Sequence, residues 1–408
     1  MNNNVPQSNR LHVGIFGETN AGKSSLFNAL TGTDISIVSD LSGTTTDSVQ
    51  KAMELNPFGP IVLIDTAGMG DDSPLGRQRM EKTQKILNRV DFALYVMDAA
   101  KIAGAQRCYK EFKAAAKNIP HLVVVTKSEN QDSLYAMAKT FSLTEGRCVP
   151  AVCISIHQQD TIDALKKIMV QKLSEIKNDS EKSLLGDLLS SCATVLMVVP
   201  IDSGAPKGRL ILPQAQLIRD CLDNGFMAHV VTEKEIGAAL QNLKHVDLIV
   251  TDSQIFGKVV QEVPPDILLT SFSILMARQK GDIKILISGI KALAGLKKHG
   301  GKVLISEVCT HNRSHEDIGH VKIPAALRKI AGDGLSFDFT TGRDFPESPE
   351  DLRQYSLIIH CGACMITPKE MQNRIASAQE AGVPITNYGL FLAYINGILD
   401  RSIEILNR

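Results

Sequence analysis

The sequence predicts an α/β protein of three modules, in which an N-terminal P-loop domain is followed by two smaller domains with parallel sheets. Three observations lead to this prediction. Short apolar runs of strand length alternate with helical stretches, as mostly parallel sheets require. A glycine-rich loop follows the first run, and 408 residues exceed what one hydrophobic core normally organises. The expected order is a disordered tail at 1–10, the first module at 11–172, a linker helix at 173–190, the second module at 191–269 and the third at 270–408.

The composition is that of a soluble globular protein, and the lack of a targeting or membrane-spanning segment predicts a cytoplasmic location. The apolar fraction is 44% and the charged fraction is 22%. Basic and acidic residues number 44 each, so no net charge draws the chain to nucleic acid or to an anionic membrane. No secretory segment follows Met1, and no apolar run is long enough to span a bilayer. We therefore expect reduced thiols, for which metal ligation is favoured over disulfides.

The first element is a strand, Leu11–Phe16, that runs into a phosphate-binding loop and then the helical stretch Ser25–Leu30. This strand, loop and helix order is the context that a P-loop needs. Lys23 is expected to reach the β- and γ-phosphate oxygens, and the Ser24 hydroxyl to bind Mg²⁺. The predicted phosphate-binding residues are Gly17, Asn20, Ala21, Gly22, Lys23, Ser24 and Ser25.

The next elements favour a GTPase over an ATPase. The apolar strand Ile61–Ile64 ends at Asp65, which can hold Mg²⁺ through water, and the N–H group of Gly68 can sense a γ-phosphate. The intervening polar loop, Asp40–Asp47, can become ordered when one threonine, Thr45, binds the metal. Further apolar strands follow at 92–98, 122–127 and 152–155. The first module is thus predicted to have the P-loop GTPase fold.

Residues 11 to about 172 resemble the translation-factor-type GTPases, closest to the branch that modifies tRNA or assembles ribosomes. The resemblance implies that GTP is the nucleotide and that Asn20 helps to bind a stimulating potassium ion. Met69 stands where many signalling GTPases have a water-orienting glutamine, which predicts slow hydrolysis.

The guanine-reading motif departs from this resemblance. The family has Asn-Lys-x-Asp, whereas this chain has Thr126, Lys127, Ser128 and Glu129. The Glu129 carboxylate can still accept hydrogen bonds from guanine, but its side chain is one methylene longer. The alternative is that Thr126–Glu129 form an ordinary strand-to-helix loop with no role in guanine binding. Ser155, at the polar end of the strand 152–155, is the last predicted nucleotide-binding residue.

The second module carries no residues that point to chemistry. Strands are predicted at 194–199, 227–231 and 247–251, with helices between them. A module of this kind, placed between two functional domains, is predicted to form a homodimer through sheet edges or helix faces.

The third module contains a cluster of thiols and imidazoles. The strand 302–306 leads to Cys309 and His311, and the strand 357–359 leads to His360, Cys361 and Cys364. Ligands gather at the carboxyl ends of parallel strands, so both groups are expected at one rim. Three soft ligands with imidazoles suit either zinc or an iron–sulfur cluster, and a reduced buried cysteine pair is the alternative. In a cluster, three cysteines leave one iron open, for which His311 and His360 are candidate ligands or hydrogen-bond donors.

The order Cys-x-His, 48 residues, then His-Cys-x-x-Cys resembles that of the [FeFe]-hydrogenase maturation GTPases, the HydF family, over essentially the whole chain. The resemblance implies a [4Fe–4S] cluster on Cys309, Cys361 and Cys364. It also implies a scaffold that receives a di-iron precursor from radical-SAM enzymes and passes it to the apo-[FeFe]-hydrogenase. Two rival functions are a potassium-dependent, RNA- or ribosome-associated GTPase with structural zinc, and a catalytic iron–sulfur enzyme.

Overall fold

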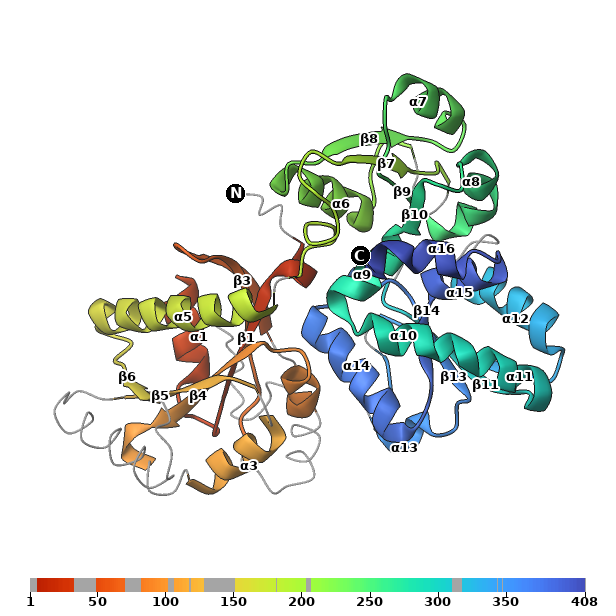
Figure 1. Ribbon diagram of the computed structural model, residues 1–408. Coiled ribbons are helices and arrows are strands. Elements are labelled where there is room, and N and C mark those ends of the chain that lie inside the picture. Colours follow the sequence, from red (N-terminus) through yellow and green to blue (C-terminus); the bar gives the residue numbers. More distant parts are fainter. Residues whose placement is uncertain are drawn as a thin grey trace. The chain divides into compact units, whose positions relative to one another are not determined.

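The computed structural model describes residues 6–32, 49–69, 82–101, 106–116, 119–127, 151–180, 182–202, 207–309, 318–342, 344–346 and 348–407. The chain divides into two compact units, 1–181 and 182–408. The first unit contains one sheet and the second contains two (Figure 1). The predicted α/β class with three successive, largely parallel sheets is confirmed.

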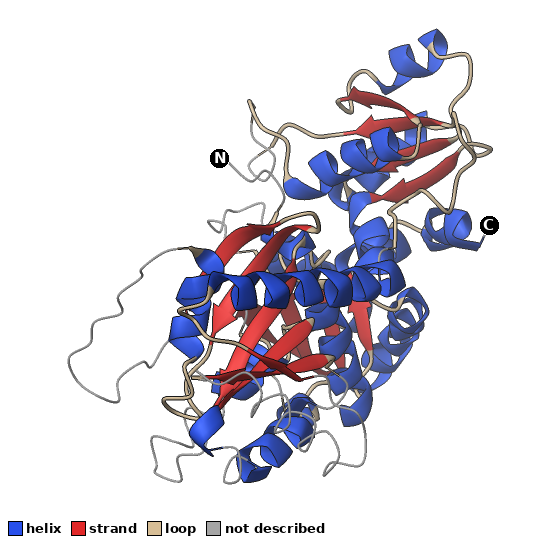
Figure 2. Ribbon diagram, turned by 90° about the vertical axis from the view of Figure 1, so that its left-hand side faces the viewer, coloured by secondary structure: helices blue, strands red, loops and turns tan. Residues whose placement is uncertain are grey.

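The first unit is a six-stranded sheet in the order β2-β3-β1-β4-β5-β6. Its strands are β1 (Leu11–Gly17), β2 (Val49–Leu55), β3 (Gly59–Asp65), β4 (Phe92–Asp98), β5 (His121–Thr126) and β6 (Ala151–Cys153). Its helices are η1 (Gln7–Asn9), α1 (Lys23–Thr31), η2 (Ala99–Lys101), α3 (Gln106–Ala116) and α5 (Gln159–Ser180). Of the strands that the structure describes in this unit, only β2 runs antiparallel to its neighbour. The central strands are almost wholly apolar because helices cover both faces of the sheet, as Figure 2 shows.

Two apolar clusters hold this sheet between its helices. On one face, Phe112 of α3 packs against Phe16 and Tyr95 of the sheet. On the other face, α1 and α5 contribute Leu26 and Leu165 to a second cluster. Because both faces are buried, the strand ends are fixed, and the loops at the carboxyl ends of β1 and β3 lie side by side.

The second unit contains two four-stranded parallel sheets, in the orders β10-β9-β7-β8 and β12-β11-β13-β14. The strands of the middle sheet are β7 (Thr194–Val198), β8 (Met227–Val231), β9 (Leu248–Thr251) and β10 (Leu268–Ser271). Those of the C-terminal sheet are β11 (Gly301–Glu307), β12 (Leu335–Thr341), β13 (Leu357–His360) and β14 (Ile385–Asn387).

Helices cover both of these sheets. Their bounds, in chain order, are α6 (Leu212–Asp223), α7 (Ile236–Asn242), η3 (Ser253–Ile255), α8 (Phe256–Glu262), α9 (Phe272–Lys280), α10 (Ile283–Gly289), η4 (Ile290–Ala292), α11 (Leu293–His299), η5 (Ile318–Lys322), α12 (Ile323–Ala331), α13 (Pro349–Leu352), α14 (Pro368–Ala381), α15 (Tyr388–Ile395), α16 (Leu399–Ile403) and η6 (Glu404–Asn407). None of the helices in the described ranges is long and apolar enough to cross a membrane.

Three features near the predicted boundaries differ in detail from the sequence-based expectation. Within the predicted disordered tail, Gln7–Asn9 form the short helix η1, and Ser8 and Arg10 are buried. The boundary at 269 and 270 falls inside β10, which pairs with β9 of the middle sheet along its whole length. Within the predicted linker helix, α5 extends only to Ser180, and the segment after it is bound to the second unit.

Candidate functional site

The phosphate loop between β1 and α1 has the backbone geometry that its glycines allow. Gly17 has φ 144° and Gly22 has φ 91°, a region that other residues rarely adopt. Lys23 lies over the loop and donates from Nζ to the carbonyl oxygens of Gly17 (3.2 Å) and Glu18 (2.7 Å). Burial lowers the pKa of Lys23 to about 8, although Asp65 and Glu18 oppose this shift. The lysine therefore remains cationic at neutral pH, and its charge lies over the phosphate loop.

A pair of oxygens suited to Mg²⁺ lies beside this loop. The Ser24 hydroxyl donates to Asp65 Oδ2 at 2.7 Å. Asp65 Oδ1 is buried and has no hydrogen-bond partner among the described residues. Burial raises the pKa of Asp65, while the bond from Ser24 and the charge of Lys23 act against that rise. A buried carboxylate oxygen without a partner is costly unless a cation binds it, so the donor set fits Mg²⁺.

The loop after β3 is held against the phosphate loop. The Met69 N–H donates to the Gly17 carbonyl at 3.0 Å, and Met69 forms a parallel bridge with Glu18. A Cβ atom on Gly68 would lie 2.4 Å from Thr19 Oγ1, so no larger residue fits there. The two predicted phosphate-sensing elements are therefore in contact. Thr45 lies outside the described residues.

Thr126, which stands where the guanine-reading motif has asparagine, and Lys127, which keeps the lysine of that motif, both contact the phosphate loop. The Thr126 hydroxyl lies 2.7 Å from the Ala21 carbonyl and 3.2 Å from that of Met97. Lys127 Nζ donates to the Asn20 carbonyl at 2.7 Å and to Asp98 Oδ2 at 2.8 Å. Burial alone would raise the pKa of Asp98, but the bond from Lys127 leaves it below its usual value.

Two further predicted nucleotide-binding residues have different outcomes. Ser155 is buried just after β6, and its backbone N–H and carbonyl both contact the Thr161 hydroxyl. Glu129 lies outside the described residues.

The predicted metal site forms at the carboxyl edge of the C-terminal sheet. Ser306 of β11 is in register with His360 of β13, and the Cys361 N–H donates to the Ser306 carbonyl at 2.9 Å. The loop after β11 therefore lies beside the turn after β13. Cys309 Sγ is 3.8 Å from Cys364 Sγ, although 55 positions separate them in the chain.

The third cysteine, Cys361, contacts the loop that carries Cys309. The Val308 N–H donates to Cys361 Sγ at 3.3 Å. The contact with Cys309 lowers the pKa of Cys364 to about 7 and raises that of Cys309, so the Cys364 thiol loses its proton first. Burial raises the pKa of Cys361 to about 12. None of the seven described cysteines forms a disulfide.

The turn that carries Cys361 and Cys364 has an unusual backbone conformation. Ala363 has φ 57°, in the left-handed region. Lys280, which is 1% exposed, donates from Nζ to the carbonyls of Ala363, Cys364 and Ile366. Sequence reasoning missed this lysine, because nothing in its helix indicates that it contacts carbonyls 83 to 86 positions later in the chain.

His360 is wholly buried and both of its ring nitrogens have partners. Arg374 Nη1 donates to Nε2 at 3.0 Å, and since arginine can only donate, Nδ1 carries the ring hydrogen. Nδ1 donates it to the Cys361 carbonyl at 2.9 Å. Burial and the charge of Arg374 lower the pKa of His360 to about 3. Arg374 is itself paired with Glu370 at 3.0 Å. His311 lies outside the described residues.

The three thiols do not form the closed ligand set of a single ion. Within the described ranges, no three His, Cys, Asp or Glu side chains are arranged to hold one metal ion. The cysteines of an iron–sulfur cluster bind different iron atoms, so they need not converge on one point. Three soft sulfur donors at one rim fit such a cluster in chemistry.

Comparisons with protein-family models give three consecutive matches. Residues 12–127 match the 50S ribosome-binding GTPase. Residues 184–281 match the hydrogen maturase F dimerization domain, and residues 284–405 match the hydrogen maturase F tetramerization domain. The N-terminal unit thus contains a GTPase domain, and the rest of the chain is built from domains associated with oligomer formation.

Curated relatives match only part of the chain. A tRNA modification GTPase, MnmE, from Chromobacterium violaceum is 32% identical over 164 residues, which is 40% of this chain and 35% of the relative. MnmE from Xanthomonas oryzae is 46% identical over 90 residues, 22% of this chain and 20% of the relative. The chain therefore spans about a third or less of the length of these relatives.

Solved structures also resemble the chain in part. Era in complex with MgGDPNP and 16S ribosomal RNA nucleotides has a TM-score of 0.36 and 26% identity, covering 39% of this chain and 55% of that one. The selenocysteine-specific elongation factor EF-Sec has a TM-score of 0.35 and 18% identity, covering 42% of this chain and 30% of that one.

Proposed function

Because the chain belongs to the hydrogen maturase F family, we propose that it is a GTP-hydrolysing scaffold that binds a [4Fe–4S] cluster and assembles or delivers the di-iron precursor of the [FeFe]-hydrogenase active site. The observation that carries the proposal is the meeting of Cys309, Cys361 and Cys364 at one rim of the C-terminal sheet. Radical-SAM maturation enzymes and the apo-hydrogenase are the proposed partners. A reducing compartment is needed to keep the thiols free, so the cytoplasm is the proposed location.

Three cysteines would hold the cluster and leave one iron open to an exchangeable ligand. When bound, the cluster would supply that iron as a docking point for the di-iron cargo. His360 supports this arrangement from outside the ligand set, because both ring nitrogens are engaged and its Nδ1–H group orients the Cys361 carbonyl. Neither predicted role of His360, iron ligand or hydrogen-bond donor to the cluster, has a free ring nitrogen here, so we assign His360 to orienting the turn. His311 remains the candidate for the open iron.

The nucleotide site would hydrolyse GTP with Mg²⁺ bound between Ser24 and Asp65. Potassium held with the help of Asn20 would stimulate the reaction. Met69 is apolar and 2% exposed at the position after Gly68, so it cannot orient water by a hydrogen bond. Hydrolysis should therefore be slow, as suits a switch that controls assembly.

Anaerobic purification followed by metal and sulfide analysis tests the proposed cluster. We expect about four iron and four sulfide ions per chain and an electron paramagnetic resonance signal after reduction. Cys364→Ser should lose both iron and signal, because it removes one of the three thiols. Cys192→Ser is the matched control, since Cys192 is an exposed free thiol on another loop.

A different metal would favour the rival function. Stoichiometric zinc without acid-labile sulfide would overturn the proposal and support a GTPase with a structural zinc site. The total charge of zero counts against RNA as the partner in that case.

A further inference from the structure

Helix α9 connects the middle sheet to the cysteine turn. It begins directly after β10 of the middle sheet, where the Ser271 hydroxyl accepts from the Ile274 N–H group, and it ends at Lys280. The helix lies in the stretch that matches the dimerization domain, whereas the turn Cys361–Cys364 lies in the stretch that matches the tetramerization domain. A contact between them therefore joins two domains of the second unit.

Lys280 makes that contact with all of its donors. Nζ lies 3.1 Å from the Ala363 carbonyl, 3.1 Å from that of Cys364 and 2.7 Å from that of Ile366. An ammonium group has three hydrogens and no acceptor, so three carbonyls satisfy it completely. A charge in an apolar interior is tolerated only when it is paired in this way. The contact thus fixes three successive parts of the cysteine turn to the last residue of α9.

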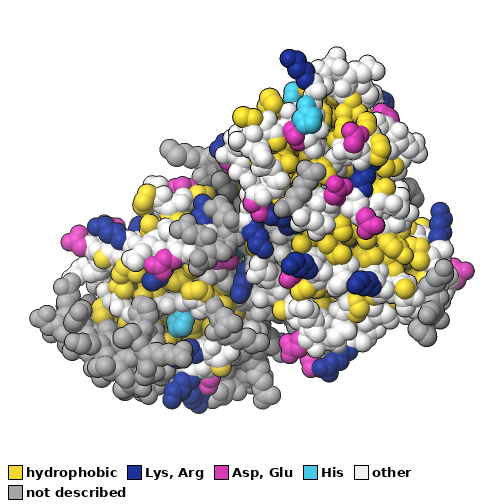
Figure 3. Space-filling model, viewed as in Figure 1, with side chains coloured by type: hydrophobic (Ala, Val, Ile, Leu, Met, Phe, Trp, Pro, Cys, Tyr) yellow, Lys and Arg dark blue, Asp and Glu magenta, His cyan; other side chains and the backbone are white. Residues whose placement is uncertain are grey.

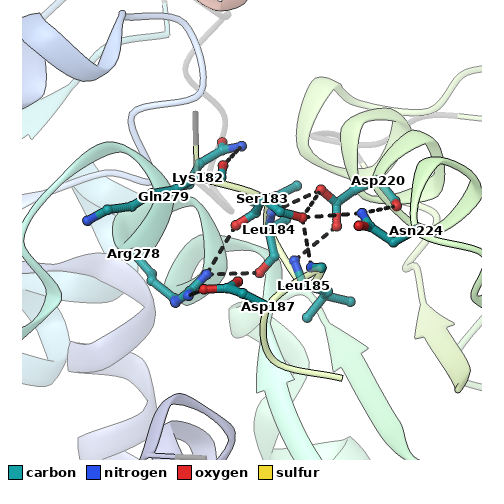
Figure 4. A network of polar contacts seen from close by, with 10 residues as sticks. Lys182, Ser183, Leu184, Leu185, Asp187, Asp220, Asn224, Arg278 and Gln279 are labelled. Atoms are coloured by element: carbon teal, nitrogen blue, oxygen red, sulfur yellow. Dashed lines mark hydrogen bonds and ion pairs between the residues drawn. The ribbon is translucent and has the colours of Figure 1, made fainter. Parts of the chain in front are cut away.

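The two residues before Lys280 bind a different segment, 182–187, where the chain enters the second unit. Arg278 donates from Nη1 to the Ser183 carbonyl at 3.1 Å and pairs with Asp187 (Figure 4). Gln279 Nε2 donates to the Lys182 carbonyl at 3.0 Å. The last turn of α9 therefore holds the entry segment and the cysteine turn at the same time.

Helix α6 holds the entry segment from the other side. The Asp220 carboxylate accepts from the Ser183 hydroxyl at 2.6 Å and from the N–H groups of Leu184 (3.0 Å) and Leu185 (2.9 Å). Figure 4 shows these bonds beside those of Arg278. Because the entry segment is hydrogen-bonded to a helix on each side, a displacement of this segment has to move α6 and α9 or break these bonds.

We propose that the last turn of α9 couples the entry segment to the cluster site, with Lys280 as the positioning residue for the cysteine turn. The inference rests on the proposed cluster function, since it assigns Lys280 a role toward that group. Its ammonium charge would also favour the reduced, more negative state of the cluster, because opposite charges attract more strongly in a buried site.

Hydrogen–deuterium exchange on the full-length, cluster-free chain tests the coupling without requiring a cluster. Lys280→Met keeps an unbranched side chain, one atom shorter and without the ammonium group, and leaves three carbonyls without donors. Exchange across 361–366 should therefore increase. Arg278→Met should increase exchange at 183–187 and also at 361–366. Exchange at 361–366 unchanged from the wild type in either variant would overturn the proposal. Lys284→Met, at an exposed position on α10, is the control and should change neither segment.

Redox titration of the reconstituted protein tests whether the charge of Lys280 acts on the cluster, apart from any effect of Lys280 on the stability of the fold. Lys280→Met should shift the midpoint potential to more negative values, whereas Lys280→Arg, which keeps the charge, should restore it toward the wild type. Equal potentials in all three proteins would overturn the electrostatic part. If the wild type binds no cluster at all, the proposed function fails while the exchange result still decides the coupling.

Acetylation of wild-type lysines covers the case in which Lys280→Met does not fold. Lys280 should react much more slowly than Lys284, because its three donors are buried against the turn. Equal labelling of the two lysines would overturn the contact itself.

Discussion

Asn20 has a left-handed backbone with φ 64°, and its carbonyl accepts a hydrogen bond from Lys127, which is paired with Asp98. These contacts fix the backbone of Asn20. Its side chain stays exposed, so the amide oxygen is available to a cation. We predict that hydrolysis falls roughly tenfold or more when sodium replaces potassium, by loss of charge stabilisation at the phosphates. Phosphate release in the two salts is the measurement. Asn20→Ala should remove the difference, and equal wild-type rates in both salts would contradict the assignment.

At the scale of single residues, the proposed ligands could be named from the sequence, whereas the residues that support them could not. Ser24, Asp65 and the cysteines follow from residue type and spacing, and the structure brings the described ones together. The departure at Thr126 was visible, but its hydroxyl bond to the Ala21 carbonyl was not, since it joins positions 105 apart. Lys280 is hidden for the same reason, because a bond to a distant backbone carbonyl leaves no pattern in the sequence.

At the scale of elements, β8 is an edge strand that exposes apolar side chains. Among the described strands it pairs only with β7, and Met227 is 51% and Val230 is 45% exposed. Figure 3 shows apolar side chains at the surface where Figure 1 places β7 and β8. An exposed apolar edge is a ready site for pairing with a second chain. We therefore propose β8 as the homodimer contact of the matched dimerization domain.

Val230→Lys should weaken this dimer, because the two copies of the new charge would be buried close together. Size-exclusion chromatography with light scattering should then show a smaller species over the same concentration range. Val230→Thr is the matched control, since it keeps the β-branched shape and should leave the mass unchanged. An unaltered mass for Val230→Lys would assign the contact to another surface.

Apolar strands were predictable, even short ones such as β9 and β13, whereas half-polar edge strands were not. The strand β4, for example, is apolar because it is buried on both faces. In contrast, β2 and β12 are edge strands with alternating or largely polar side chains, so their sequences do not stand out. The strand β10 has only four residues and leads straight into α9, so its place beside β9 depends on distant pairing.

At the scale of the whole molecule, the C-terminal end of the chain packs back onto the middle sheet and so joins the two sheets of the second unit. Ile405 of η6 is wholly buried in the apolar cluster of the middle sheet, together with Val195 and Leu268. The predicted order of one module after another cannot include such a return, because periodicity describes neighbours in the chain only. The domain boundaries drawn from the sequence therefore remain predictions within this unit.

The first and second units each have cores of their own, which allows the two chemistries to be separated. Lys23 supplies charge to the nucleotide site alone, since its bonds go to the Gly17 and Glu18 carbonyls. Lys23→Ala should therefore lower GTP hydrolysis roughly a hundredfold or more, by loss of phosphate stabilisation. Iron content should stay at the wild-type value, because the cysteine turn is fixed by Lys280 and by β11. Both quantities are measured on one preparation, with the exposed Lys167→Ala as the control. Iron lost together with hydrolysis would mean that the cluster site depends on an intact nucleotide site, and the scaffold would then need GTP to hold its cluster rather than to time its release.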